Sequence, residues 1–195
     1  MQEVISFRAP ALRVSNITAR ALIETGFRID SSIASQRFDF FLSFGSKQKL
    51  NFLTAPRLPY RTKTNNIFAK GDSPLVEVPL SATLLPFVGT TMRMMPGLTS
   101  LQQKLLHLES GINAKPVVFG VHPNEFIDES SEERVINRRS SNPIAYLLTD
   151  YLRANLKVKN LGPKGIGVYE EFIKFYVNKA YSMPTVKEYV SEIFD

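Results

Sequence analysis

The feature that most constrains the fold is an alternation of short apolar runs with helical patterns along the chain. The run "EVISF" (3–7) precedes "SNITARALIETG" (15–26), a helical pattern with Ser15 as its N-cap and Gly26 at its end. Three more strand-like runs are "FRIDSSI" (27–33), "LVEVPLSATLL" (75–85) and "PVVFGVH" (116–122). Because strands joined by helical crossovers pair in parallel, this order predicts an α/β fold with a parallel or mostly parallel sheet.

Apolar periodicity predicts which helix faces pack on a core. The expected rows are Ile17, Ala21 and Leu22 in the first helix, and Leu101, Leu105 and Leu108 in a helix over 98–111. Thr99 and Gln102 have the spacing of a capping box, which predicts that the second helix starts at this point.

The remaining segments divide the chain into two parts. Residues 34–74 are expected to form a long, mostly irregular connection that includes the basic and aromatic stretch "RLPYRTK". A polar linker at 129–143 is followed by three predicted helices, at 143–156, 169–181 and 185–194, the last with a capping box of Thr185 and Glu188. We therefore expect an α/β part at residues 1–135 and a helical extension at residues 136–195 that packs on it.

Composition excludes several classes of protein. The chain has 195 residues, of which 44% are hydrophobic, so it can bury one sizeable core. The absence of cysteine excludes disulfides and thiolate metal sites. The net charge of +6 is spread along the sequence without a clustered basic stripe, which disfavours nucleic acid as a partner. Neither a signal peptide nor an apolar run of about 18 residues occurs, so we expect a soluble, cytoplasmic protein without membrane contact.

Two side chains suited to chemistry follow predicted strands. Arg8 comes after the first strand, and His122 comes after the fourth. Since parallel strands bring their carboxyl ends to one rim, we expect both side chains to share it. Simpler roles stay open: His122 as a hydrogen-bonded rim residue, Arg8 paired with a carboxylate such as Glu3, and Asp30 as a turn residue in "DSS".

Four motifs, in order, resemble those of a known enzyme family. They are "FRAPALRVSNITARALIETGFRIDSSI", "LVEVPLS", "MRMMP" and "VFGVHPNE". Over residues 4–128 the chain is similar to the C-terminal part of the polysaccharide deacetylases, the NodB-like carbohydrate esterases. The resemblance implies an incomplete or distorted (β/α) barrel, with the helical extension packed outside. It also implies hydrolysis of the N-acetyl group of an amino sugar, or of a related amide or ester.

The resemblance implies roles for individual residues. His122 would be the general acid that protonates the leaving amine, and general acid catalysis typically raises a reaction rate by about 10²–10⁴-fold. Arg8, in the "RxP" motif, would orient the catalytic base, and Asp30 would tune or orient the histidine. The residues expected to contact or shape the substrate site are Pro10, Arg93, Pro123 and Glu125.

The sequence departs from the family at the metal site. Family members hold a divalent metal, often zinc, with one Asp and two His from an "Asp-Asp" and an "HxxxH" motif, and neither motif occurs here. The two histidines, His107 and His122, lie on different elements, and one plausible ligand cannot hold a catalytic zinc ion. We therefore predict that this chain alone binds no metal. Asn124 also replaces the Trp that is usual in this branch of the family.

The short chain raises the question of what completes the fold. A barrel of this kind needs about 250 residues, and a part of one would leave open sheet edges. We expect a partner polypeptide or self-association to cover them, with an N-acetylated saccharide as the substrate. Two alternatives belong to other classes: a non-catalytic carbohydrate-binding or assembly protein with this fold, and a basic nucleic-acid-binding protein.

Overall fold

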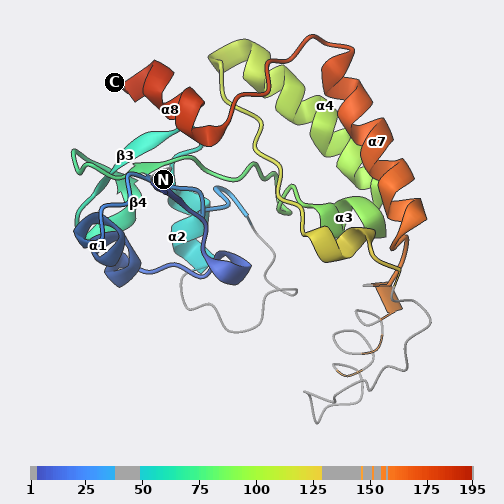
Figure 1. The fold of residues 1–195 in the computed structure, drawn as a ribbon, viewed down its shortest axis with the longest axis horizontal. Coiled ribbons are helices and arrows are strands. Elements are labelled where there is room, and N and C mark those ends of the chain that lie inside the picture. The colour runs from blue at the N-terminus through green and yellow to red at the C-terminus, as the bar shows by residue number, and fades with distance from the viewer. Residues whose placement is uncertain are drawn as a thin grey trace.

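A computed structural model describes residues 4–37, 49–128, 146, 151, 155–156 and 158–194. The fold is mixed α/β and is built around an open five-stranded sheet (Figure 1). The strands are β1 (Ser6–Phe7), β2 (Ile29–Asp30), β3 (Tyr60–Lys63), β4 (Asn66–Lys70) and β5 (Val76–Glu77). Their order in the sheet is β1-β2-β5-β3-β4. The predicted α/β class is confirmed, and closure into a barrel stays a prediction.

The parallel part of the sheet is formed by the strands that alternate with helices. β1 pairs with β2 and β2 pairs with β5 in parallel, while β3 runs antiparallel to both β5 and β4. The expectation of an irregular connection over 34–74 was wrong, because this segment contains α2 (Lys49–Thr54) and the β3–β4 hairpin. Residues 38–48 of the same connection lie outside the described residues.

The first helix, α1 (Asn16–Glu24), begins and ends where its local signals predict. The Ser15 N–H donates to Thr18 Oγ1 at 3.0 Å, and Gly26 adopts a φ of +84° just beyond the end. The predicted apolar row is only partly right: Leu22 is buried, whereas Ile17 is 80% exposed. Ala19 takes the second core position instead, because the helix turns its Ala19 and Leu22 side toward the sheet.

The long helix α4 (Pro96–Asn113) buries a different face from the one predicted. Leu101, Leu105 and Leu108 are exposed, while Gln102 and Gln103 are buried. The reason is hydrogen bonding by the two glutamine amides. Gln102 Nε2 donates to Thr83 Oγ1 and to the Leu85 carbonyl, both at 2.9 Å, and Gln103 Nε2 donates to the Phe172 carbonyl at 2.8 Å. The helix starts at a Met95 N-cap, so the predicted capping box of Thr99 and Gln102 was also wrong.

Neighbouring leucines of α4 give a test of this orientation. Leu106 is 1% exposed and Leu105 is 48% exposed. We expect Leu106→Ala to lower the free energy of unfolding by about 2–5 kcal/mol, since it leaves a cavity. Leu105→Ala should cost less than about 1 kcal/mol, because no cavity forms at the surface. Urea unfolding of the two variants measures both values, and a larger loss for Leu105→Ala would show that the exposed row is in fact covered.

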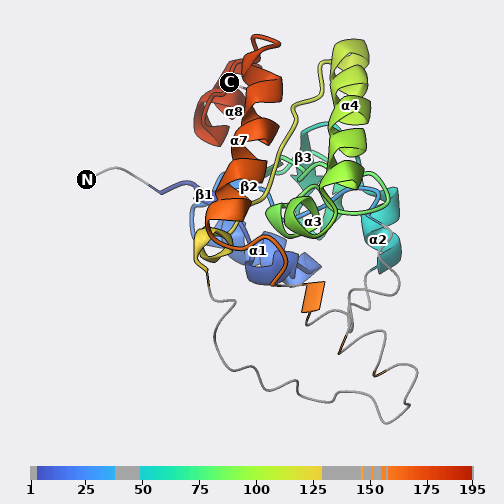
Figure 2. The same cartoon turned by 90° about the vertical axis from the view of Figure 1, so that its right-hand side faces the viewer.

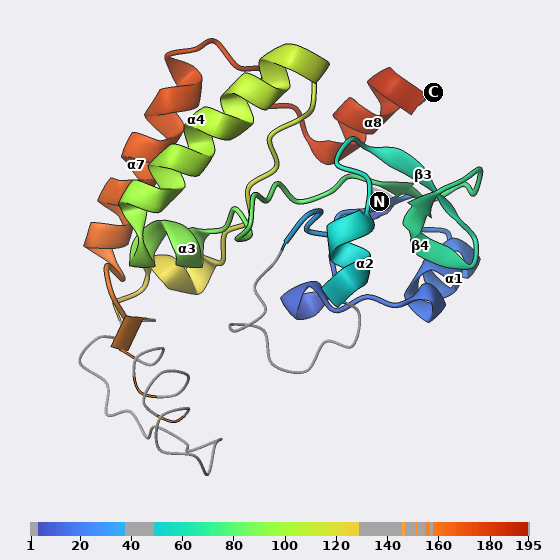
Figure 3. The same ribbon diagram turned by 180° about the vertical axis from the view of Figure 1, so that it is seen from behind.

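A second core lies between α3 (Gly89–Met94), α4 and α7 (Pro163–Val177). Phe87, Phe119 and Phe172 meet there, with ring centroids of Phe87 5.1 and 5.3 Å from those of the other two. Figures 1 and 3 show α4 and α7 running alongside each other, with the segment that leads from α4 towards His122 to one side of the pair, and Figure 2 shows the same helices from the right-hand side of Figure 1.

The C-terminal helices pack against the α/β part. α7 covers Phe87, and α8 (Val186–Phe194) places Val190 against Ile29 and Val76. The predicted capping box of α8 is confirmed: the Thr185 N–H donates to Glu188 Oε2 at 2.7 Å, and the Glu188 N–H donates to Thr185 Oγ1 at 3.2 Å. Most of the helix predicted at 143–156, and the domain boundary at residue 135, lie outside the described residues. No helix in the described part of the chain combines the length and the apolar composition needed to cross a membrane.

Candidate functional site

The carboxyl ends of the parallel strands form one rim. Arg8 directly follows β1, Asp30 ends β2 and Glu77 ends β5. The fourth strand predicted over 116–122 was wrong: this segment forms only an isolated parallel bridge, between Gly120 and Val88, because few of its backbone groups find a neighbouring strand. It is tied to the segment after β5, since the Ser81 N–H donates to the Val118 carbonyl at 2.9 Å. Residues that are far apart in the sequence therefore meet where the strands end, as parallel pairing requires.

Arg8 is anchored to the end of β2. Its Nε donates to the Ser31 carbonyl at 2.9 Å, and its Nη2 donates to Ser31 Oγ at 2.7 Å. Nη1 points elsewhere and lies 3.9 Å from the position that a Cβ on Gly120 would occupy. The residue as a whole is exposed, and the guanidinium is its shielded part. Partial burial lowers the pKa of Arg8, while the charges of Glu77 and Asp30 oppose that shift.

His122 is a near neighbour in sequence of Gly120, the residue that the Arg8 guanidinium approaches. It comes two residues after Gly120, a span of at most about 7 Å. It is exposed and precedes the short 3₁₀ helix η2 (Pro123–Phe126), whose first residue, Pro123, needs no hydrogen-bond partner for its nitrogen. The structure brings the Arg8 guanidinium beside Gly120, and the meeting of Arg8 and His122 at one rim stays a prediction. His107, the other histidine, lies on α4 and is packed on Tyr181, with 2.6 Å between Nδ1 and the hydroxyl.

Asp30 has a carboxyl neighbour that sequence analysis did not identify. Asp30 and Glu77 are register partners on β2 and β5, both are 0% exposed, and their carboxyls are close enough for each to shift the pKa of the other. Burial raises the pKa of Asp30, against hydrogen bonds from Ser32 and Glu77 that lower it. Burial also raises the pKa of Glu77 well above its ordinary value, and the Asp30 charge raises it further. A carboxylate inside the apolar run "LVEV" was the available signal for Glu77.

Arg93 and Glu125 form an ion pair beneath the loop that carries His122. Their side chains are 4% and 5% exposed, and Arg93 Nη2 lies 3.6 Å from Glu125 Oε1. The same carboxylate accepts hydrogen bonds from Thr90 Oγ1 at 2.5 Å and from the His122 N–H at 3.3 Å. Arg93 Nη1 also donates to the Lys159 carbonyl at 2.8 Å. These two residues hold the loop in place, and their predicted contact with a substrate stays a prediction.

The two prolines among the predicted residues mark chain turns on the rim. Pro10 starts the short 3₁₀ helix η1 (Pro10–Leu12), in which the Leu12 N–H donates to the Ala9 carbonyl at 3.0 Å. Ala9 is buried, and its N–H donates to Ser32 Oγ at 2.8 Å, which ties the end of β1 to the segment after β2. Pro10 thus begins a short helical turn two residues after Arg8.

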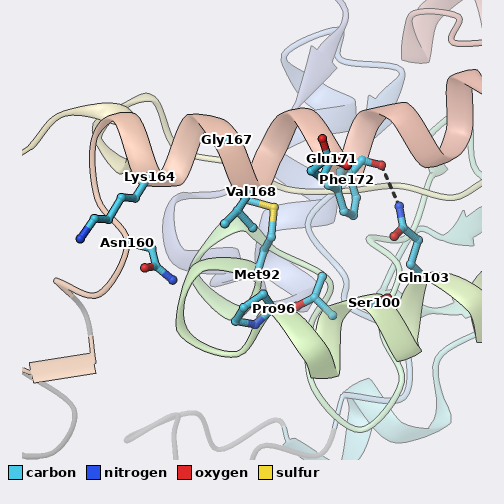
Figure 4. A pocket seen from close by; sticks show the side chains of 11 residues that line it. Met92, Pro96, Ser100, Gln103, Asn160, Lys164, Gly167, Val168, Glu171 and Phe172 are labelled. Atoms are coloured by element: carbon cyan, nitrogen blue, oxygen red, sulfur yellow. Dashed lines mark hydrogen bonds between the residues drawn. The ribbon is translucent and has the colours of Figure 1, made fainter.

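A separate cavity of about 610 Å³ lies between α3, α4 and α7 (Figure 4). Asn160 and Lys164 lie at one end of it and Gln103 at the other, where its amide reaches the Phe172 carbonyl. None of the predicted site residues lines this cavity. This cavity is therefore separate from the end of β1 that carries Arg8.

The described residues do not suit the zinc ion that the family resemblance implies. No group of three or more His, Cys, Asp or Glu side chains within the described ranges is arranged to hold a metal ion. Comparisons of the chain with models of protein families, with curated proteins and with solved structures found no match. The resemblance to the deacetylases therefore depends on its four motifs and their order.

Proposed function

We propose that this chain supplies the arginine and histidine side of a site that deacetylates an N-acetylated saccharide. The observation that supports the proposal is the approach of the Arg8 guanidinium, at the carboxyl end of β1, to Gly120, two residues before the exposed His122. These are the two positions at which the family's "RxP" arginine and general-acid histidine would stand.

The environment of each side chain suits its proposed role. Histidine is the side chain that most often serves as a general acid, and His122 is exposed enough to reach a leaving amine. Two of the guanidinium nitrogens of Arg8 are committed to Ser31, which fixes the plane of the group. The third nitrogen approaches Gly120, in the segment that leads to His122, and would orient an anionic group at the rim.

A partner must provide what the described residues lack. β1 is an edge strand of the described sheet, so its outer N–H and C=O groups offer a place for another strand to pair. We propose that a partner polypeptide, or a second copy of the chain, completes the incomplete (β/α) barrel there. Since the metal ligands are not among the described residues, the Asp-Asp and HxxxH motifs would belong to that partner.

Acetate release tests the proposal. The chain is mixed with a polypeptide that carries the Asp-Asp and HxxxH motifs, and acetate released from N-acetylglucosamine oligomers is measured with and without a chelator. We expect release only from the mixture without chelator, and we expect His122→Ala to slow it by about 10²–10⁴-fold. His107→Gln is the matched control and should keep most of the rate, because His107 contacts Tyr181 and not the rim. Release that His122→Ala leaves unchanged would overturn the proposal.

One observation favours a second candidate function, saccharide binding without catalysis. The described residues hold no metal-binding group, yet they keep an exposed Arg8 and an exposed His122. Calorimetric titration with the same oligomers separates the two functions. Binding by the chain alone that a chelator does not change, together with no acetate release from any mixture, is the result this second function expects.

A further inference from the structure

The buried carboxyl pair Asp30 and Glu77 lies at the centre of the parallel sheet. The two residues face each other in the register of β2 and β5, and neither has any exposed surface. Each uses one oxygen for a hydrogen bond: Asp30 Oδ1 accepts from Ser32 Oγ at 2.6 Å, and Glu77 Oε1 accepts from the Ile33 N–H at 3.0 Å. The second oxygens, Asp30 Oδ2 and Glu77 Oε2, have no donor among the described residues.

A proton between the two carboxyls resolves this arrangement. An ionised carboxylate only accepts hydrogen bonds, so two ionised groups in contact would repel each other and leave two buried oxygens unsatisfied. One protonated carboxyl donates to the other and satisfies both. The effect of burial on the pKa of each group has the same sign, since it favours the neutral form of Asp30 and of Glu77.

The charged and titratable neighbours support one proton and not two. Arg8, from the end of β1, is the cation whose charge acts on both carboxyls, and a single negative charge on the pair balances it. Tyr60, from β3, is the register partner of Glu77, but its hydroxyl donates to the Ile67 carbonyl at 2.8 Å and so is not the missing donor. Burial and the charges of Glu77 and Asp30 raise the pKa of Tyr60, which keeps that hydroxyl neutral.

We propose that Asp30 and Glu77 share one proton and act as a single buried anion that positions the ends of β1, β2 and β5. The Ala9 N–H donates to Ser32 Oγ, which in turn donates to Asp30, and the Ile33 N–H donates to Glu77. Both carboxyls therefore hold the backbone beside Arg8, and Glu77 is a positioning residue for the rim. This inference concerns the proton content of the rim and does not depend on the proposed function.

The shared proton predicts that the free energy of unfolding falls as the pH rises. The pKa of Glu77 is raised in the folded state, so its stabilising contribution is fully present below the unfolded pKa of about 4.3 and is lost as the pH rises through the folded pKa. Over that window the native chain holds one more proton than the unfolded chain. We expect this pair to raise the unfolding equilibrium constant about tenfold per pH unit above about pH 5, measured by urea unfolding.

Matched variants isolate the pair from other titrating groups. Glu77→Gln keeps a donor toward Asp30 Oδ2 but has no titrating proton. The tenfold rise of the unfolding equilibrium constant per pH unit should therefore disappear, while the free energy of unfolding near neutral pH is largely kept. Glu171→Gln, in an exposed ion pair with Lys174, should keep the wild-type dependence. If the unfolding equilibrium constant of Glu77→Gln depended on pH as that of the wild-type chain does, the proposal would be overturned.

A direct measurement decides the matter even if Glu77→Gln fails to fold. Carbon NMR of the carboxyl groups in the wild-type chain should show one protonated carboxyl for the pair at neutral pH, with the titration midpoint displaced upward from ordinary carboxyl values. Two carboxyls that both ionise near pH 4 would overturn the shared proton. Neither experiment involves a saccharide, so their failure is distinguishable from failure of the proposed deacetylation.

Discussion

Replacing Glu125 by glutamine is expected to lower the free energy of unfolding by about 3–5 kcal/mol. The change removes the negative charge that faces Arg93, and both side chains are about 95% shielded from water. Removing one member of a buried ion pair weakens the compensation of the remaining buried charge, which is far more costly than losing a surface pair. The site also tolerates little rearrangement, because the carboxylate packs so closely against Gly89 that a Cβ there would collide with it.

Urea or thermal unfolding measures this loss, and Glu171→Gln provides its control. Glu171 pairs with Lys174 at 2.7 Å, but the two side chains are 74% and 60% exposed, so the expected loss is within about 0.5 kcal/mol. The Glu125 variant should also loosen the loop that carries His122, since the His122 N–H donates to this carboxylate. Equal losses for the two variants would mean that Arg93 and Glu125 are not paired in solution.

Phe87→Ala is the second change with a large expected effect, again about 3–5 kcal/mol. Phe87 is fully buried, and its ring contacts those of Phe119 and Phe172. Truncation leaves a cavity between α7 and the segment that leads to His122. It also removes the ring contacts of Phe87 with Phe119 and Phe172. The Phe87 carbonyl also accepts a hydrogen bond from the Gly120 N–H at 3.2 Å. We therefore expect the segment around Gly120 to become more mobile when this core is disrupted.

Thermal unfolding checks the Phe87 prediction against a neighbour. For a domain of this size the loss corresponds to a fall in Tm of roughly 6–20 °C. Leu84→Ala is the control, because Leu84 lies three positions earlier and is 69% exposed, and its cost should stay within about 0.5 kcal/mol. Should Leu84→Ala lower Tm as much as Phe87→Ala, the assignment of the second core to Phe87 would be wrong.

Several elements were predictable because their signals are local. The capping box of Thr185 and Glu188 involves residues three positions apart, so α8 begins where the sequence indicates. The same holds for the end of α1 at Gly26, where a positive φ favours glycine. The hairpin of β3 and β4 was missed although its turn lies in "KTNN", because the flanking strands do not show a clear alternation of apolar and polar residues.

The orientation of α4 shows where periodicity fails. Its most apolar row, with Leu101 and Leu105, is the exposed one, and the amides of Gln102 and Gln103 face the interior. Burial of a glutamine is favourable only when partners accept its hydrogen bonds, and those partners lie on residues 83–85 and on α7. A single-sequence pattern cannot anticipate partners that only the folded chain brings within reach.

By itself, the sequence determined the α/β class, the parallel pairing of the strands that alternate with helices, and the position of Arg8 directly after the first of those strands. These features follow from local hydrogen bonding and from the period of apolar residues. Only the tertiary structure decided that Glu77 lies against Asp30 and that Arg93 lies against Glu125, because each pair joins residues more than 30 positions apart. The free energy of such pairs depends on burial and on a facing charge, and both exist only once the strands and helices have packed.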